Sequence, residues 1–343
     1  MLLKKIEELE KDLKNSKLDS LYLLYGEELF LLETSLKKIK EIFGECIKGI
    51  NYITIDDTNV SQIISDIETP SFGYEKKLII ARNTGIFKKD GKRKNAEIVN
   101  LRQKILDYIK GNVEIIKNSI VLVFIEDEAD SKLELYKLID KMGVICNFEY
   151  QKPIQIAKRL KAICNGYKVN IDEPTLKYFI ECCGTNMQDL INEIRKLIEY
   201  AGKGGTISKK EIDILSIKKL ESVIFDLTDN LGKKETQKAL KVLENLIYAK
   251  EPIQKILITL YNHFKKLYIT QIAITKSKDV AESLSLKPNQ IFLVNKYKMQ
   301  SKYFRGNELK EILQSLRDLD YNYKNGNIDL QLGLEAILCR YCS

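Results

Sequence analysis

The sequence predicts an α/β fold for residues 1–150, followed by an all-α fold for residues 151–343. In the first part, short apolar runs rich in strand-forming residues alternate with amphipathic stretches long enough for a helix, as in a parallel sheet covered by helices. After Pro153, apolar residues recur every three or four positions, which is the spacing of helices. A chain of 343 residues has room for two or three domains.

Five strands are expected in the first part, each separated from the next by a stretch long enough for a helix. They are Tyr22–Tyr25, Tyr52–Ile55, Lys77–Ala81, Ile120–Ile125 and Val144–Phe148. A short helix is expected at Ser61–Ile67, just before the third strand.

The second part is expected to contain a small helical domain, residues 151–215, and a longer helical array, residues 216–343. Asp172 before Pro174 is a good helix opening, and Ser208 with Glu211 has capping-box spacing. The predicted helices are Ile154–Cys164, Glu173–Cys183, Met187–Tyr200, a short one after Ser208, Ser222–Leu231, Glu235–Tyr248, Pro252–Thr275, Val280–Leu286, Pro288–Gln300, Asn307–Tyr323 and Leu330–Cys339.

The composition is that of a globular protein, with 44% hydrophobic and 30% charged residues. Met1–Glu10 lacks the apolar core of a signal peptide and no long apolar run occurs, so we expect a cytoplasmic protein. The seven cysteines are expected to be reduced core residues. Cys339 and Cys342 have Cys-x-x-Cys spacing without a second ligand pair, and the only histidine, His263, is expected to be packed or on the surface, so neither metal nor catalytic site is predicted.

The net charge of +8 is concentrated at the end of the chain. Lys and Arg number 24 against 26 Asp and Glu in residues 1–150, 11 against 8 in 151–215, and 21 against 14 in 216–343, or net −2, +3 and +7. A basic last third suits contact with nucleic acid, and a solvated lysine-rich surface explains it equally well.

The first candidate site is Leu21–Glu33, which reads as a buried strand, a turn and the start of a helix, where nucleotide-binding proteins hold phosphate. A Walker A loop needs a second glycine, then lysine and Ser or Thr, so that amides and an ammonium converge on phosphate. Here Gly26 is followed by Glu27 and Glu28. We therefore expect no nucleotide cofactor at this turn.

The second candidate is Val121–Glu128, an apolar run that ends in Glu126, Asp127 and Glu128. It resembles a Walker B strand, whose acids hold magnesium and activate water. Without a phosphate loop to bring the metal, a buried strand followed by a solvated acidic turn is the simpler interpretation. A strand of this form beside an empty first loop suggests a nucleotidase fold that has lost its chemistry.

The third candidate is Ile67–Gly73, which lies between the short helix and the third strand. Pro70 and Gly73 bracket Ser71 and Phe72, so we expect a turn with an aromatic ring at its tip. Such a ring either folds back onto the core or projects towards a partner. The pattern alone favours the core.

The fourth candidate is the basic stretch 254–310, which holds eleven Lys and Arg against three acidic residues, with Tyr297, Tyr303 and Phe304 interleaved. Lysines can neutralise phosphates while aromatic rings stack on bases. Wet lysine faces over buried aromatics are an equally good interpretation. The candidate DNA contacts are Lys296, Lys298, Lys302, Tyr303 and Arg305. A second basic cluster, Lys88–Lys94, is centred on glycine and is most simply a solvated loop.

Together these features resemble the delta subunit of the bacterial DNA polymerase III clamp loader. The resemblance runs over nearly the whole chain and rests on the order and spacing of five short, mostly apolar segments. They are Leu21–Glu28 (LYLLYGEE), Thr69–Ile80 (TPSFGYEKKLII), Gly184–Leu197 (GTNMQDLINEIRKL), Val223–Gly232 (VIFDLTDNLG) and Tyr323–Cys339 (YKNGNIDLQLGLEAILC).

The resemblance implies an AAA+-like domain that binds no ATP over 1–150, a small helical lid domain over 151–215 and a helical collar over 216–343. It implies a non-catalytic subunit without cofactor or metal, which opens the ring-shaped sliding clamp for loading onto primed DNA. The implied partners are the clamp, primer-template DNA, and the ATPase and delta-prime type subunits, which the collar would join. ATP hydrolysis would belong to those sister subunits.

In the family, a hydrophobic pair at the end of the helix that precedes the third strand inserts into a hydrophobic pocket on the clamp, and that position matches Ser71 and Phe72. The resemblance therefore favours a Phe72 that faces the clamp. Ser71 departs from the family, where a second large apolar residue is usual, and the loss is on the order of 1.5–3 kcal/mol of transfer free energy. Ile67 or Tyr74 is expected to compensate, or the contact is weaker.

Two other functions stay open at this point. One is a residual nucleotidase of the AAA+ class that uses the Val121–Glu128 strand. The other is a stand-alone DNA-binding module built on residues 254–310.

Overall fold

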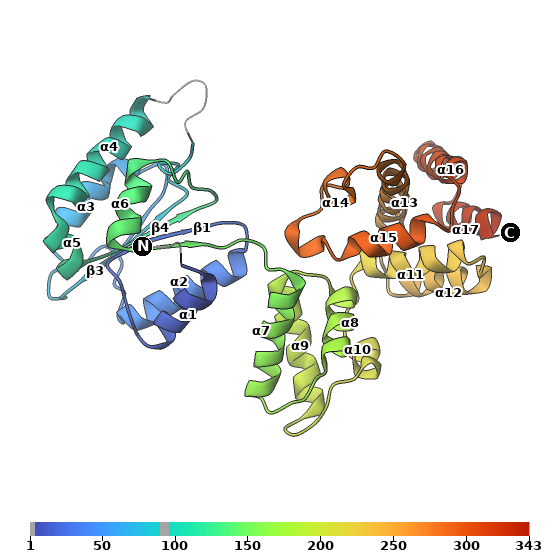
Figure 1. Ribbon diagram of the computed structural model, residues 1–343, viewed down its shortest axis with the longest axis horizontal. Coiled ribbons are helices and arrows are strands. Elements are labelled where there is room, and N and C mark those ends of the chain that lie inside the picture. Colours follow the sequence, from blue (N-terminus) through green and yellow to red (C-terminus); the bar gives the residue numbers. More distant parts are fainter. Residues whose placement is uncertain (1–3, 90–95, 343) are drawn as a thin grey trace. The chain divides into compact units, whose positions relative to one another are not determined.

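The computed structural model describes residues 4–89 and 96–342, and it divides the chain into two compact units (Figure 1). We call Met1–Tyr150 the sheet unit and Gln151–Ser343 the helical unit. The predicted basic loop Lys88–Lys94 falls mostly on residues outside the described ones. No helix within the described ranges is long and apolar enough to cross a membrane.

The sheet unit contains one parallel sheet of five strands in the order β2-β3-β4-β1-β5. The strands are β1 (Leu21–Tyr25), β2 (Tyr52–Ile55), β3 (Lys77–Arg82), β4 (Ile120–Glu126) and β5 (Val144–Asn147). The predicted parallel sheet is confirmed, and no predicted strand end is displaced by more than one residue.

Helices cover both faces of this sheet, which is why its central strands are apolar throughout. One face, with Leu23 and Leu122, packs against α3–α6, and the other face, with Tyr22 and Val123, is also fully buried. Figure 1 shows α1 and α2 on that second side. The helices are α1 (Ile6–Lys14), α2 (Leu29–Phe43), α3 (Ile63–Glu68, after a 3-10 turn at Val60–Gln62), α4 (Ala96–Gly111), α5 (Val113–Ser119) and α6 (Glu134–Met142).

All regular elements in the described part of the helical unit are helices, as predicted. Asp172 caps α8 by accepting a hydrogen bond from Thr175 N–H at 2.7 Å, and Ser208 with Glu211 forms the expected capping box. The helices are α7 (Pro153–Gly166), α8 (Glu173–Cys183), α9 (Met187–Ala201), α10 (Lys209–Leu215), α11 (Leu220–Gly232), α12 (Thr236–Tyr248), α13 (Ile253–Thr275), α14 (Val280–Ser283), α15 (Leu293–Ser301), α16 (Gly306–Lys324) and α17 (Leu330–Cys342).

Two helix predictions in this unit are wrong. The expected helix Pro288–Gln300 is a 3-10 turn at Pro288–Gln290 followed by α15, because the buried Asn289 side chain bonds to Thr185 Oγ1 at 2.9 Å, a contact far away in sequence. The expected helix Val280–Leu286 ends at Ser283. Ser285 takes a left-handed conformation there, with φ of 51°, and stops it.

Four cysteines are buried, namely Cys146, Cys164, Cys182 and Cys183, as expected of core residues. Cys339 is exposed and Cys46 is only partly buried, so the expectation is wrong for these two. The division of the helical unit into a lid domain, 151–215, and a collar domain, 216–343, stays a prediction.

Candidate functional site

The turn after β1 is closed by the backbone at the end of β5. Glu28 N–H donates to the Phe148 carbonyl at 2.8 Å, and Phe148 N–H donates to the Tyr25 carbonyl at 2.6 Å. Gly26 N–H donates to the Glu126 carbonyl at 3.2 Å. A phosphate loop turns such amides towards its ligand. In this chain the amides of Gly26 and Glu28 are already bonded within the protein.

Gly26 has a packing role that the sequence pattern did not reveal. Its φ is 128°, and a Cβ atom there would lie 2.5 Å from the Phe148 carbonyl oxygen. Only glycine allows two backbone segments to approach so closely at such a φ. The glycine at this turn therefore accommodates β5.

Glu126 at the end of β4 supports a neighbouring loop. Its buried carboxylate accepts hydrogen bonds from Thr84 N–H at 3.0 Å and from Gly85 N–H at 3.3 Å, and burial raises its pKa. Asp127 and Glu128, which follow, are exposed. A buried strand followed by a solvated acidic turn is therefore the correct interpretation. Among residues 4–89 and 96–342, no three His, Cys, Asp or Glu side chains gather as a metal would require.

The Phe72 turn, Ser71–Tyr74, lies between α3 and β3 and is a β-turn. Tyr74 N–H donates to the Ser71 carbonyl at 3.0 Å, and Gly73 has a φ of 87°, as the third residue of a type II turn requires. Phe72 occupies the second position of this turn. Its side chain is 74% exposed, so the interpretation that the ring folds back onto the core is wrong.

The other three predicted clamp-binding residues differ in what their side chains do. Ser71 Oγ donates to the Tyr74 carbonyl at 2.6 Å, and Tyr74 Oη donates to a Glu45 carboxylate oxygen at 3.1 Å. Ile67 is 4% exposed and lies in the core with Ile63, one helical turn earlier. The suggestion that Ile67 contacts a partner beside Phe72 is therefore wrong, because its side chain faces inward.

The predicted DNA contacts lie on α15 and on the connection to α16. Lys298, Lys302 and Arg305 are exposed, whereas Lys296 forms an ion pair with Glu181 at 2.8 Å. Tyr303 is 38% exposed. Tyr297 and Phe304, the other two aromatic residues proposed to stack on bases, are buried, so that interpretation is wrong for them.

His263 is a packed core residue. It is 5% exposed, and its Nε2 atom lies 2.8 Å from Gln300 Oε1. Gln300 Nε2 donates to the Phe225 carbonyl and to Asp229 Oδ1, both at 2.8 Å, so Gln300 Oε1 accepts and His263 Nε2–H donates. Burial lowers the pKa of His263 to about 4. The ring is therefore neutral at physiological pH and holds helices together.

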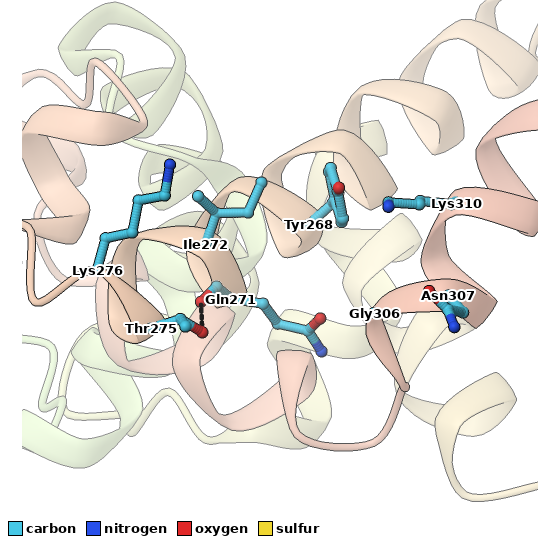
Figure 2. A pocket seen from close by; sticks show the side chains of 8 residues that line it. All are labelled: Tyr268, Gln271, Ile272, Thr275, Lys276, Gly306, Asn307 and Lys310. Carbon is cyan, nitrogen blue, oxygen red and sulfur yellow. Dashed lines mark hydrogen bonds between the residues drawn. The ribbon is translucent and has the colours of Figure 1, made fainter.

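A pocket of about 250 Å³ lies between α13 and the start of α16 (Figure 2). Gln271 Nε2 donates to the carbonyls of Ser301 and Phe304, at 2.6 and 2.7 Å. Lys310 Nζ lies 5.8 Å from the centroid of the Tyr268 ring, and Figure 2 shows both side chains on the same side of the pocket. These polar groups tie α13 to the end of α15 and to α16.

Known proteins and family models are similar to this chain along most of its length. The family model described as DNA polymerase III, delta subunit, matches residues 22–149, and the model of the C-terminal domain of that subunit matches residues 221–341. A probable DNA polymerase III subunit delta from Aquifex aeolicus (strain VF5) is 30% identical over 321 residues, which cover 88% of this chain and 85% of that protein. The DNA polymerase III subunit delta of Bacillus subtilis (strain 168) is 23% identical over 334 residues, which cover 96% and 94%.

One solved structure has the same fold along its length. The Bacillus subtilis DNA clamp loader delta protein superimposes with a TM-score of 0.76 at 22% identity, over 98% of this chain and 99% of that chain. The predicted fold class is confirmed as a parallel-sheet α/β part followed by an all-α part. The AAA+-like character of the first part stays a prediction.

Proposed function

This chain belongs to the DNA polymerase III delta subunit family, and we propose that it binds the sliding clamp through Phe72 and opens the clamp ring for loading onto primed DNA. We infer that it is a clamp-loader subunit, as the similar Bacillus subtilis delta protein is. In the proposed role it forms and breaks no covalent bond, acts in the cytoplasm and needs no cofactor of its own. In this proposal, the free energy of binding to the clamp alone drives the opening of the ring.

The observation that carries this proposal is the presentation of Phe72. A phenylalanine that is 74% exposed, at the second position of a hydrogen-bonded turn, is an apolar side chain that a partner can bury. Its position matches the hydrophobic pair by which the family is expected to bind the clamp. Ser71 closes the turn through its bond to the Tyr74 carbonyl, so it shapes the contact and adds no second apolar side chain.

Magnitudes limit what Phe72 does alone. Shifting a ring from 1% open to 99% open requires about 5.5 kcal/mol of preference for the open form. Burying one phenylalanine contributes about 1.5–3 kcal/mol. Phe72 is therefore the anchor of a wider contact, and neighbouring surface of the sheet unit supplies the remaining preference for the open ring.

The other partners follow from the same role. Residues 216–343 would join the ATPase and delta-prime type subunits as a collar, and ATP hydrolysis by the ATPase subunits would control access to Phe72. Primer-template DNA would pass the exposed Lys298, Lys302 and Arg305, each able to neutralise a phosphate. The residual-nucleotidase alternative has no support, since Gly26 and Glu28 N–H already have partners within the protein.

The test is binding of the purified chain to a purified sliding clamp without nucleotide, measured by surface plasmon resonance. We expect the same affinity with and without ATP, because Phe72 is exposed in the isolated chain. Lack of binding, or binding that appears only on addition of ATP, would contradict the proposal.

A further inference from the structure

Lys77, the first residue of β3, is a buried lysine with no part in the clamp contact proposed above. The residue is 1% exposed and ranks among the largest fully buried side chains of the described part of the chain. A buried ammonium is costly unless hydrogen bonds satisfy it. Lys77 Nζ donates to the Asp66 carbonyl at 2.7 Å and to the Thr69 carbonyl. Burial lowers the pKa of Lys77, and the negative charge of Asp66 opposes that shift.

Both acceptors lie at the C-terminal end of α3. The last carbonyls of a helix have no partner within the helix, and the partial negative charge there favours a cation. The backbone of Lys77 is fixed in β3, between β2 and β4. Its side chain therefore ties the end of α3 to the start of β3.

The loop that carries Phe72 runs between these two tied points. Its base is held where Lys77 meets Thr69, and its tip is held by the Phe72 turn and by the bond from Tyr74 Oη to Glu45. The bond from Tyr74 Oη to Glu45 is exposed, whereas the bonds at the base are partly buried and come from the buried Lys77 side chain. Bonds to a charged, buried donor are the stronger ones.

We propose that Lys77 is a positioning residue for the clamp contact, because its buried ammonium holds the Phe72 turn in the conformation that a partner binds. The inference rests on the proposed function of Phe72. When only a fraction of molecules has the binding-competent conformation, the apparent affinity falls by that fraction. Loss of the Lys77 bonds lowers this fraction in the free protein and leaves the bound contact intact. Association slows, and dissociation does not change.

The experiment replaces Lys77 by methionine in the full chain, which keeps the apolar stem and removes the donors. We expect about ten-fold slower association with the immobilised clamp and dissociation within two-fold of wild type, a ten-fold change being about 1.4 kcal/mol. In the free chain, amide exchange of Thr69 and Tyr74 should accelerate, since their N–H groups donate to Ser65 and Ser71 carbonyls in the held loop. The control is Lys37→Met, at an exposed lysine of α2.

A Lys77→Met chain with wild-type association and wild-type exchange would overturn the inference. So would slower association accompanied by an equally large increase in the dissociation rate constant, which indicates general damage to the contact. If Lys77→Met does not fold, the same measurements on Lys77→Gln decide, with slower association expected and wild-type association contradicting the proposal. Failure of this inference can be told apart from failure of the proposed function. The exchange measurement tests the role of Lys77 without any clamp. A Phe72→Ala chain with wild-type affinity for the clamp would contradict the proposed function itself.

Discussion

Replacing Phe72 by alanine is expected to weaken binding to the sliding clamp at least 30-fold while leaving the stability of the chain unchanged. The side chain is 74% exposed, so its loss removes few contacts within the fold. A large apolar anchor at the centre of an interface contributes about 2 kcal/mol or more, which is about 30-fold in affinity. The loss should appear as faster dissociation, because the turn that presents residue 72 stays formed.

The measurement is the dissociation constant without nucleotide, with thermal unfolding recorded in parallel. The matched control is Leu29→Ala, another large apolar residue of the sheet unit, 57% exposed. Leu29 follows the carboxyl end of β1, whereas Phe72 precedes the amino end of β3, so the two lie at opposite edges of the parallel sheet. The assignment of Phe72 as the clamp anchor would be contradicted by a Phe72→Ala chain whose affinity is within two-fold of wild type. It would also be contradicted if Leu29→Ala lost as much affinity as Phe72→Ala.

Replacing Gly26 by alanine is expected to destabilise the sheet unit by about 3 kcal/mol or more. At a φ of 128° the new Cβ would lie 2.5 Å from the Phe148 carbonyl oxygen. Backbone must then move, and the hydrogen bond of 2.6 Å from Phe148 N–H to the Tyr25 carbonyl would lengthen or break. Both the backbone strain and the loss of this hydrogen bond lower the free energy of unfolding of the sheet unit.

Amide exchange of β1 and β5 as a function of urea is the appropriate measurement, because a chain with two units need not unfold in one step. Gly111→Ala is the control, since a Cβ there meets nothing within 4 Å. If Gly26→Ala exchanges like wild type, the packing role of Gly26 is wrong. If Gly26 served to bind phosphate, Gly26→Ala would instead leave the fold stable and abolish only ligand binding.

The regular elements of the sheet unit could be predicted from the sequence because burial on both faces makes its strands continuous apolar runs. The strand Val121–Ile125 is buried throughout and is recognisable without any partner. Elements fixed by distant contacts could not be predicted. The interruption before α15 depends on the bond from Asn289 to Thr185, which no local pattern encodes.

The candidate site also has a part that the local sequence predicts and a part that only the fold determines. Pro70 and Gly73 predicted the turn, and its tip is where Phe72 lies. Whether the ring faces the core or the solvent depends on how α3 meets β3, and the local pattern favoured the wrong side. Lys77 was missed because a lysine at the start of a strand normally reaches solvent; only the fold places the end of α3 over its ammonium.

Ring opening is the central claim, and its most direct measurement uses a clamp with a fluorophore pair across one subunit interface. Added without nucleotide, the wild-type chain is expected to separate the pair, and Phe72→Ala at the same concentration is expected to leave the ring closed. A wild-type chain that saturates the clamp while the pair stays together would contradict the account, because binding would then occur without opening.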